Sequence, residues 1–325
     1  MTHAIRIHEY GGPEVLRWEE VAVGDPGPGE LRIRHGAIGL NYIDVYHRTG
    51  LYPLPALPWT LGMEGAGRVE AVGPGVSEFK VGDRVAYASP PVGAYAEVRL
   101  MPADRVVALP DAIDERAAAA MLLQGMTAQY LLRRSYRVQA GDTILLHAAA
   151  GGVGLIASQW ARHLGATVIG TVGSEAKAAL ARAHGCDHVI DYRRENIVER
   201  VREITGGAGV AVVYDSVGKD TFMDSLDCLR PLGMMVSFGN ASGPVPAFEP
   251  GLLAAKGSLF FTRPSLMHYT ARRADLLASA AELFAVVTGG AVKIEVNQTY
   301  PLAETAQAHR DLEARQTTGS TVLLP

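Results

Sequence analysis

The sequence predicts an α/β protein in which a doubly wound, parallel Rossmann sheet accompanies a second, mainly β domain. Three observations lead to this. A strand, a turn of small residues and a helix follow one another over residues 143–166. Strands and helices alternate after this stretch, whereas short strands separated by Gly and Pro precede it. A chain of 325 residues is long enough to give each domain its own core.

Residues 143–166 have the form of a dinucleotide-binding unit. The apolar run 143–147 predicts a buried strand, and the turn 148–154 contains no side chain larger than valine. Small residues let the backbone approach a pyrophosphate, and the N-terminus of the following helix offers it unpaired N–H groups. In the pattern G-x-G-x-x-G the first glycine is replaced by Ala149, while Gly151 and Gly154 are kept. An ordinary strand-to-helix turn is the alternative.

Residues 1–124 contain many short strand patterns with turns rich in Gly and Pro, among them 30–37, 65–72 and 93–98. This arrangement predicts a small barrel-like domain. The alanine-rich segment that follows is predicted to be helical and to be broken into two helices at Gly125. We place the domain junction there.

The second half predicts a complete Rossmann sheet. Counting the strand of the glycine turn, six strands are expected, at residues 143–147, 167–172, 188–190, 210–214, 234–238 and 258–262. Ligands of such sheets bind at the carboxyl ends of the strands. The tail after Pro264 should return to the first domain, because its apolar faces would otherwise be uncovered.

The end of the second strand indicates which nucleotide is bound. An NAD enzyme usually carries Asp or Glu there to bind the ribose 2′-hydroxyl. Here the sequence has Gly173 and Ser174, and no carboxylate occurs before Glu175 in the next helix. Lys177 follows one turn later, where an ammonium group can pair with a 2′-phosphate. The sequence therefore favours NADPH, although a solvated helix lysine is the alternative for Lys177.

Composition and charge exclude several classes of protein. Thirty basic and 34 acidic residues leave a net charge of −4, which gives no reason to expect nucleic acid as a partner. No long apolar run and no secretory leader is evident, so we expect a cytoplasmic protein without a membrane partner. Cys186 and Cys228 are expected to be two intracellular thiols.

Several motifs along the whole chain resemble the quinone oxidoreductase and zeta-crystallin branch of the medium-chain dehydrogenase/reductase family, and especially its bacterial NADPH-dependent members. The residues that carry the resemblance are Gly141-Asp142, Leu145, AAGGVG at 149–154, Gln159 and Arg162, together with GGPEVL at 11–16, NYIDVY at 41–46, DSVG at 215–218, VSFGN at 236–240 and the Arg315…Gly319-Ser320 ending.

The resemblance implies a GroES-like catalytic domain over residues 1–124, a Rossmann NADPH-binding domain over 125–264, and a return segment over 265–325 that completes the catalytic domain. It also implies a homodimer that pairs the last Rossmann strand, 258–262. Zinc-dependent relatives bind their metal through Cys and the His of a G-H-E motif. Here Asn41 and Met63 occupy the corresponding positions, and thioether sulfur does not replace imidazole on zinc, so we expect no metal.

Positions matched to the family would form the NADPH pocket. Lys177, Tyr192 and Arg315 would surround the 2′-phosphate. The complete set is Asn41, Thr127, Ala149, Gly151, Gly152, Val153, Gly173, Ser174, Lys177, Tyr192, Ser216, Phe238, Gly239, Asn240, Phe261, Arg263 and Arg315.

The chemistry expected is reduction of a quinone by the nicotinamide in a cleft between the domains, where the protein positions both rings and stabilises charge on the quinone oxygen. We predict that Tyr46 and Tyr52 contact the substrate, that Asn41 and Asp44 organise the cleft, and that Arg263 adds positive charge. Packing of the tyrosines at the domain interface is the structural alternative. Two other functions stay open: reduction of the C=C bond of an α,β-unsaturated carbonyl, and a crystallin-like protein that binds NADPH or RNA without important turnover.

Overall fold

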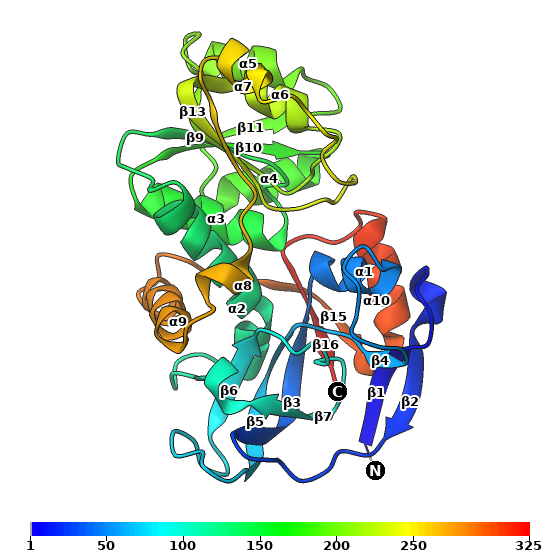
Figure 1. Cartoon of the computed structure of the whole chain (residues 1–325). Helices are drawn as coiled ribbons and strands as arrows, with labels where there is room; N and C mark the ends of the chain where they lie inside the picture. The colour runs from blue at the N-terminus through cyan, green and yellow to red at the C-terminus, as the bar shows by residue number, and fades with distance from the viewer. Residues whose placement is uncertain (1) are drawn as a thin grey trace. The chain divides into compact units, whose positions relative to one another are not determined.

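The computed structural model describes residues 2–325, and the chain divides into two compact units (Figure 1). The first unit contains the chain up to Gln124 together with Arg272–Phe284 and Ile294–Pro325. The second contains Gly125–Ala271 and Ala285–Lys293. The return to the first unit thus begins at Arg272, later than the predicted residue 265. The assignment of catalysis to one unit and NADPH binding to the other stays a prediction.

The first unit is built around the long strand β3 (Glu30–Leu40), which pairs antiparallel with β5 (Glu64–Val72) on one side. On the other side it pairs with β7 (Val98–Pro102) through its first half and with β16 (Ser320–Leu324) through its last residues. The C-terminal strand therefore joins the sheet of the N-terminal segment. The sheet is completed by β6 (Arg84–Ala88), β8 (Val107–Ala108) and β15 (Val296–Pro301), and a second sheet contains β1 (Thr2–Ile7), β2 (Arg17–Val21) and β4 (Trp59–Thr60).

Alternation explains why β3 forms. The side chains of Leu31 and Ile33 are fully buried on one face of the strand, whereas Arg34 on the other face is exposed. The strand predicted over 93–98 is wrong for most of its length. The N–H groups of Gly93 and Ala94 both donate to the carbonyl of Gly62, at 2.8 and 3.0 Å, so this segment is a loop and β7 starts at Val98.

The second unit confirms the predicted doubly wound Rossmann sheet. Its six strands are all parallel, in the order β11-β10-β9-β12-β13-β14. Helices α3 and α4 cover one face, and α5, α6 and α7 cover the other (Figure 1). The strands are β9 (Thr143–Leu146), β10 (Thr167–Val172), β11 (His188–Asp191), β12 (Val210–Asp215), β13 (Leu229–Ser237) and β14 (Phe260–Thr262). The helices are α3 (Gly152–His163), α4 (Glu175–Ala183), α5 (Ile197–Ile204), α6 (Phe222–Asp227) and α7 (Gly251–Ala255).

Helix α2 (Glu115–Tyr130) runs without interruption through Gly125, so the predicted break is wrong. A glycine within a helix costs only about 1 kcal/mol relative to alanine. Burial of Met121, Leu122 and Met126, none of which has measurable exposure, outweighs this cost.

The remaining helices are α1 (Tyr42–Thr49), α8 (Leu266–Tyr269), α9 (Arg273–Thr288) and α10 (Thr305–Glu313). Within residues 2–325, none of the helices combines the length and the apolar character that crossing a bilayer requires.

Candidate active site

The turn between β9 and α3 has the close backbone packing that a dinucleotide-binding turn requires. A Cβ atom on Gly154 would lie 2.4 Å from the carbonyl oxygen of Ala148 and 2.6 Å from that of Ala149. Gly151 is the N-cap of α3 in an extended conformation, and within the described chain no side chain caps this helix end. The first N–H groups of α3 are therefore available for an anion, as a pyrophosphate would need.

A buried polar chain lies beneath this turn and joins the carboxyl ends of three strands. His147, which follows β9, lies 3.0 Å from the hydroxyl of Thr171 on β10 and 3.0 Å from that of Ser225. Ser225 in turn donates to Asp215, the last residue of β12, at 2.9 Å. Because each of these side chains is buried and hydrogen-bonded, this polar network holds the ends of the three strands in register.

The residues predicted for the 2′-phosphate meet at the end of β10. Ser174 is the N-cap of α4, and its hydroxyl accepts a hydrogen bond from the Lys177 N–H at 3.3 Å. Tyr192 follows β11, and its phenol oxygen would lie 2.4 Å from a Cβ atom on Gly173. The absence of a side chain at Gly173 thus makes room for Tyr192, and Gly173, Ser174, Lys177 and Tyr192 form one corner of the second unit.

The other predicted cofactor residues of the second unit lie at the ends of the remaining strands. Ser216 follows β12 and Phe238 follows β13; a Cβ atom on Gly239 would lie 2.4 Å from the carbonyl oxygen of Ser216. Asn240 comes next in the chain, and Arg263 follows β14. Phe261 belongs to an aromatic cluster, its ring centroid 5.3 Å from that of Phe248 and 6.0 Å from that of Phe222. Its ring therefore packs the core of this unit.

Three tyrosines cluster on and just after α1 in the first unit. The ring centroids of Tyr42 and Tyr46 are 5.6 Å apart, and those of Tyr46 and Tyr52 are 5.1 Å apart. His47 joins them, its ring 6.2 Å from that of Tyr52, and burial lowers its pKa to about 4. The neutral imidazole makes this cluster uncharged near neutral pH, as suits a flat apolar substrate.

Asn41 is buried at the start of α1, where its side chain is held by two neighbours. Its Nδ2 donates to Glu64 Oε2 at 2.7 Å, and its Oδ1 accepts from Gln124 Nε2 at 3.2 Å. Glu64 Oε1 accepts from the Leu123 N–H at 2.8 Å, and Gln124 Oε1 accepts from Ser320 Oγ at 2.7 Å. These partners fix the Asn41 amide, which fits the predicted organising role; direct contact with the cofactor stays a prediction.

Asp44 and Glu64 are two fully buried carboxyl groups in this region. Burial raises the pKa of Asp44 to about 7, against the opposing effect of hydrogen bonds from the Asn41 N–H and the Tyr95 hydroxyl, each at 2.9 Å. Burial also raises the pKa of Glu64 to about 8, and the nearby Asp44 adds to this effect. Both groups therefore hold protons more strongly in the folded chain than in the unfolded one.

This difference predicts how Asp44 affects stability. Its folded-state pKa lies above the unfolded value of 3.8, so its contribution is complete below that pH and is lost as the pH rises through about 7. Between the unfolded and the folded pKa, the free energy of unfolding falls by about 1.4 kcal/mol per pH unit.

Asp44→Asn keeps an oxygen for both hydrogen bonds and cannot ionise. Urea unfolding at about pH 5 and about pH 8 should show the variant gaining stability relative to the unsubstituted chain at the higher pH. An identical difference at both pH values would contradict the raised pKa.

The predicted site residues are divided between the two units. Asn41, Asp44, Tyr46, Tyr52 and Arg315 belong to the first, and the turn 149–153, Thr127, Lys177 and Tyr192 belong to the second. Thr127 is buried on α2, and Arg315 follows α10 with a left-handed φ of 59°. The grouping of Arg315 with Lys177 and Tyr192 stays a prediction.

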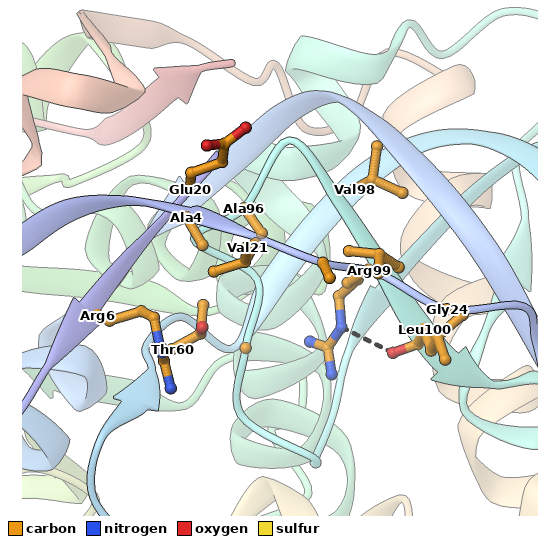
Figure 2. Close-up of a pocket in the computed structure, with 13 residues that line it drawn as sticks. Ala4, Arg6, Glu20, Val21, Gly24, Thr60, Ala96, Val98, Arg99 and Leu100 are labelled. Atoms are coloured by element: carbon orange, nitrogen blue, oxygen red, sulfur yellow. Dashed lines mark hydrogen bonds between the residues drawn. The ribbon is translucent and has the colours of Figure 1, made fainter. Parts of the chain in front are cut away.

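A pocket of about 500 Å³ lies elsewhere in the first unit, against β1 and the 93–100 segment (Figure 2). The pocket is lined by the buried Arg99, whose guanidinium donates to the carbonyls of Pro91 and Leu100 at 2.9 and 3.1 Å. No residue predicted for the reaction lines this pocket. The lining residues are Ala4, Arg6, Glu20, Val21, Ala22, Val23, Gly24, Thr60, Gly93, Ala96, Val98, Arg99 and Leu100.

Comparison with known proteins places both units in described families. Residues 152–283 match the model of the zinc-binding dehydrogenases, and residues 27–111 match the alcohol dehydrogenase GroES-like domain. The chain is 56% identical over 325 residues to a quinone oxidoreductase of Pseudomonas aeruginosa, with all of both chains covered. It is 51% identical to a 2-haloacrylate reductase of a Burkholderia species, covering all of this chain and 99% of that one. A solved quinone oxidoreductase of Escherichia coli in complex with NADPH matches with a TM-score of 0.98 and 50% identity, over 99% of this chain and 100% of that one.

The residues at the expected zinc position do not fit a zinc ion. Asn41 presents an amide whose two polar groups are already bonded to Glu64 and Gln124, and Met63 presents a thioether. Within residues 2–325, no three His, Cys, Asp or Glu side chains are grouped so that they could hold a metal.

Proposed function

The chain belongs to the quinone oxidoreductases of the medium-chain dehydrogenase/reductase family, and we propose that it reduces quinones with NADPH and without a metal. The observation that carries the proposal is the corner formed by Gly173, Ser174, Lys177 and Tyr192. It has no carboxylate for a ribose hydroxyl and contains an ammonium group suited to a 2′-phosphate. A relative that matches over 99% of this chain and 100% of its own is solved in complex with NADPH.

The residues of the second unit fit this cofactor. The N–H groups at the start of α3 would bind the pyrophosphate, and the turn 149–153 would let it approach the backbone. Lys177 and Tyr192 would bind the 2′-phosphate, joined by Arg315. When bound, NADPH supplies the hydride and the protein supplies its orientation.

The tyrosine cluster of the first unit is the proposed quinone contact. Tyr46 and Tyr52 offer flat faces for stacking and hydroxyls that donate to a quinone oxygen on which charge develops. Asp44 and Asn41 hold the start of α1 and so orient these rings. Arg263 would add positive charge to the same oxygen.

Reduction of an α,β-unsaturated carbonyl is the second candidate, and the likeness to a 2-haloacrylate reductase favours it. It uses the same cofactor but delivers hydride to carbon. NADPH-driven turnover of 1,4-benzoquinone and of a simple enal separates the two: we expect faster turnover of the quinone, and a preference for the enal would replace the first proposal by the second. The crystallin-like alternative, which includes RNA binding, gains no support from a net charge of −4.

The proposal includes a homodimer formed through the end of the Rossmann sheet. β14 is the last strand in the sheet order, and an edge strand presents unpaired N–H and C=O groups. Phe260 on β14 is 55% exposed, and Leu232 on the neighbouring β13 is 67% exposed. These apolar side chains beside an open edge support pairing with a second copy, and sedimentation equilibrium, with a dimer expected, measures it. A cytoplasmic location also stays a prediction.

A further inference from the structure

Helix α1 is attached near both of its ends to a single residue of α10, His309, through a ring of hydrogen bonds. Asp44 and Arg48 are four residues apart on α1, so they share one face of the helix. The Tyr95 hydroxyl donates to Asp44 Oδ2 at 2.9 Å and lies 3.1 Å from His309 Nε2. Arg48 Nη1 donates to the other ring nitrogen, His309 Nδ1, at 3.0 Å. In Figure 1 the two helices lie side by side.

One arrangement of protons satisfies every hydrogen bond in this closed network. A guanidinium can only donate, so His309 Nδ1 accepts from Arg48 and the imidazole proton is on Nε2. That proton is donated to the Tyr95 oxygen, and the Tyr95 hydroxyl proton is donated to Asp44. All four side chains are buried, with Arg48 only 1% exposed. A buried polar network of this kind stabilises one arrangement strongly, because any shift leaves a charged or polar group without a partner.

Arg48 also holds the end of α10. Its two terminal nitrogens bind both carboxylate oxygens of Glu313 at 2.8 Å, and Glu313 is the last residue of that helix. Arg315 lies two residues further along. Arg315 directly follows Ala314, the C-cap of α10, with a left-handed φ of 59°, so its backbone continues from the helix end that Arg48 holds.

The opposite face of α1 carries the tyrosines. Tyr46 is two residues from both Asp44 and Arg48, which places it about 200° around the helix from them. Burial raises the pKa of Tyr42 above its usual value, with Glu313 raising it further and Arg315 lowering it. The end of α10 and the tyrosine face of α1 are therefore in electrostatic contact at Tyr42.

We propose that Arg48 is a positioning residue. By holding both α1 and the end of α10, it fixes the positions of the substrate tyrosines of α1 and of the phosphate ligand Arg315, so that quinone binding and the preference for NADPH depend on the same guanidinium. The inference rests on the proposed function, since it takes Tyr46 as a quinone contact and Arg315 as a ligand of the 2′-phosphate.

The test compares KM values for NADPH, NADH and 1,4-benzoquinone in three variants of the full chain. Glu313→Gln removes the two-pronged ion pair and should raise the KM for NADPH about tenfold, the effect of one weakened charge-assisted contact, with little change for NADH or quinone. Tyr95→Phe removes the hydrogen bonds that join Asp44 to His309 and should raise the KM for quinone alone. In Arg48→Lys a single ammonium group cannot bind both carboxylate oxygens of Glu313 and His309 at once, so the KM for both NADPH and quinone should rise. Arg310→Lys, an exposed change on the same helix, is the control.

A merely structural role for Arg48 would lower the amount of active protein, and with it the apparent kcat, while all three KM values stayed at those of the unsubstituted chain. That result, or an equal rise of the KM for NADPH and NADH in Glu313→Gln, would overturn this inference and leave the proposed function standing. An unsubstituted chain that does not prefer NADPH, or does not reduce the quinone, would overturn the proposed function and this inference with it.

Discussion

Gly154→Ala should remove NADPH binding and destabilise the second unit by about 3 kcal/mol or more, because the added methyl group has no space. Its carbon would lie 2.4 Å from the Ala148 carbonyl oxygen, 2.6 Å from that of Ala149 and 2.7 Å from the Ala149 carbonyl carbon. These are backbone atoms of the turn, which cannot move aside as the end of a flexible side chain can. Thermal unfolding and quenching of tryptophan fluorescence by NADPH measure the two effects.

Gly151→Ala is the informative partner of this variant. The backbone there is extended, with φ of −84°, and the nearest atom to an added Cβ, the Ala148 carbonyl oxygen, is 3.2 Å away. The variant should lower the Tm far less than Gly154→Ala and still bind NADPH more weakly, because the second glycine of the motif lets the pyrophosphate approach the backbone. Gly24→Ala, with open space around the added atom, is the neutral control. Full stability and NADPH affinity in Gly154→Ala would show that the turn does not have the role described.

Lys177→Ala should weaken the binding of NADPH by roughly tenfold to a hundredfold while leaving NADH nearly unchanged, as expected for one charge-assisted contact with a phosphate. Lys177 lies in the first turn of α4, next to Ser174 and Gly173, with Tyr192 over the glycine. The 2′-phosphate is the only chemical difference between the two cofactors, so the ratio of their affinities isolates this corner.

Arg182→Ala is the matched control for Lys177→Ala. Arg182 is on the same helix, about two turns beyond Ser174, and pairs with Glu175 at 3.2 Å on the exposed surface, so its loss removes a positive charge that a carboxylate already neutralises. Fluorescence titrations with both cofactors should give an unchanged affinity ratio for this variant. Equal weakening of NADPH and NADH by Lys177→Ala would contradict the assignment of the 2′-phosphate to this corner.

The Rossmann sheet was predictable because its signals are local. The central strands β9, β10 and β12 are apolar runs buried on both faces. The glycine motif is contained in the seven residues 148–154, which follow β9 and run into the start of α3. The corner at Gly173 was predictable for the same reason, since three of its four residues are within one turn of each other. Gly125 shows the limit of local signals: its helix-breaking tendency is overcome by burial of its neighbours, which the sequence does not display.

The polar networks of the first unit could not be predicted because they join residues far apart in the chain. Glu64 was visible as the residue after Met63, but its bond to Leu123, 59 positions away, depends on the tertiary fold. The ring through Asp44, Tyr95 and His309 spans more than two hundred positions, and none of the ten histidines has a sequence pattern that marks it. The Asn41–Tyr52 segment was recognised as chemically important, whereas the groups that fix it in place were not.

Steady-state oxidation of NADPH and of NADH with 1,4-benzoquinone, in the presence and absence of a chelator, measures whether the protein is a metal-independent quinone reductase that prefers NADPH. We expect rapid oxidation of NADPH by the quinone, much slower oxidation of NADH, and no effect of the chelator. Equal rates with the two cofactors, no transfer to the quinone, or activity that disappears with the chelator and returns with zinc would contradict it.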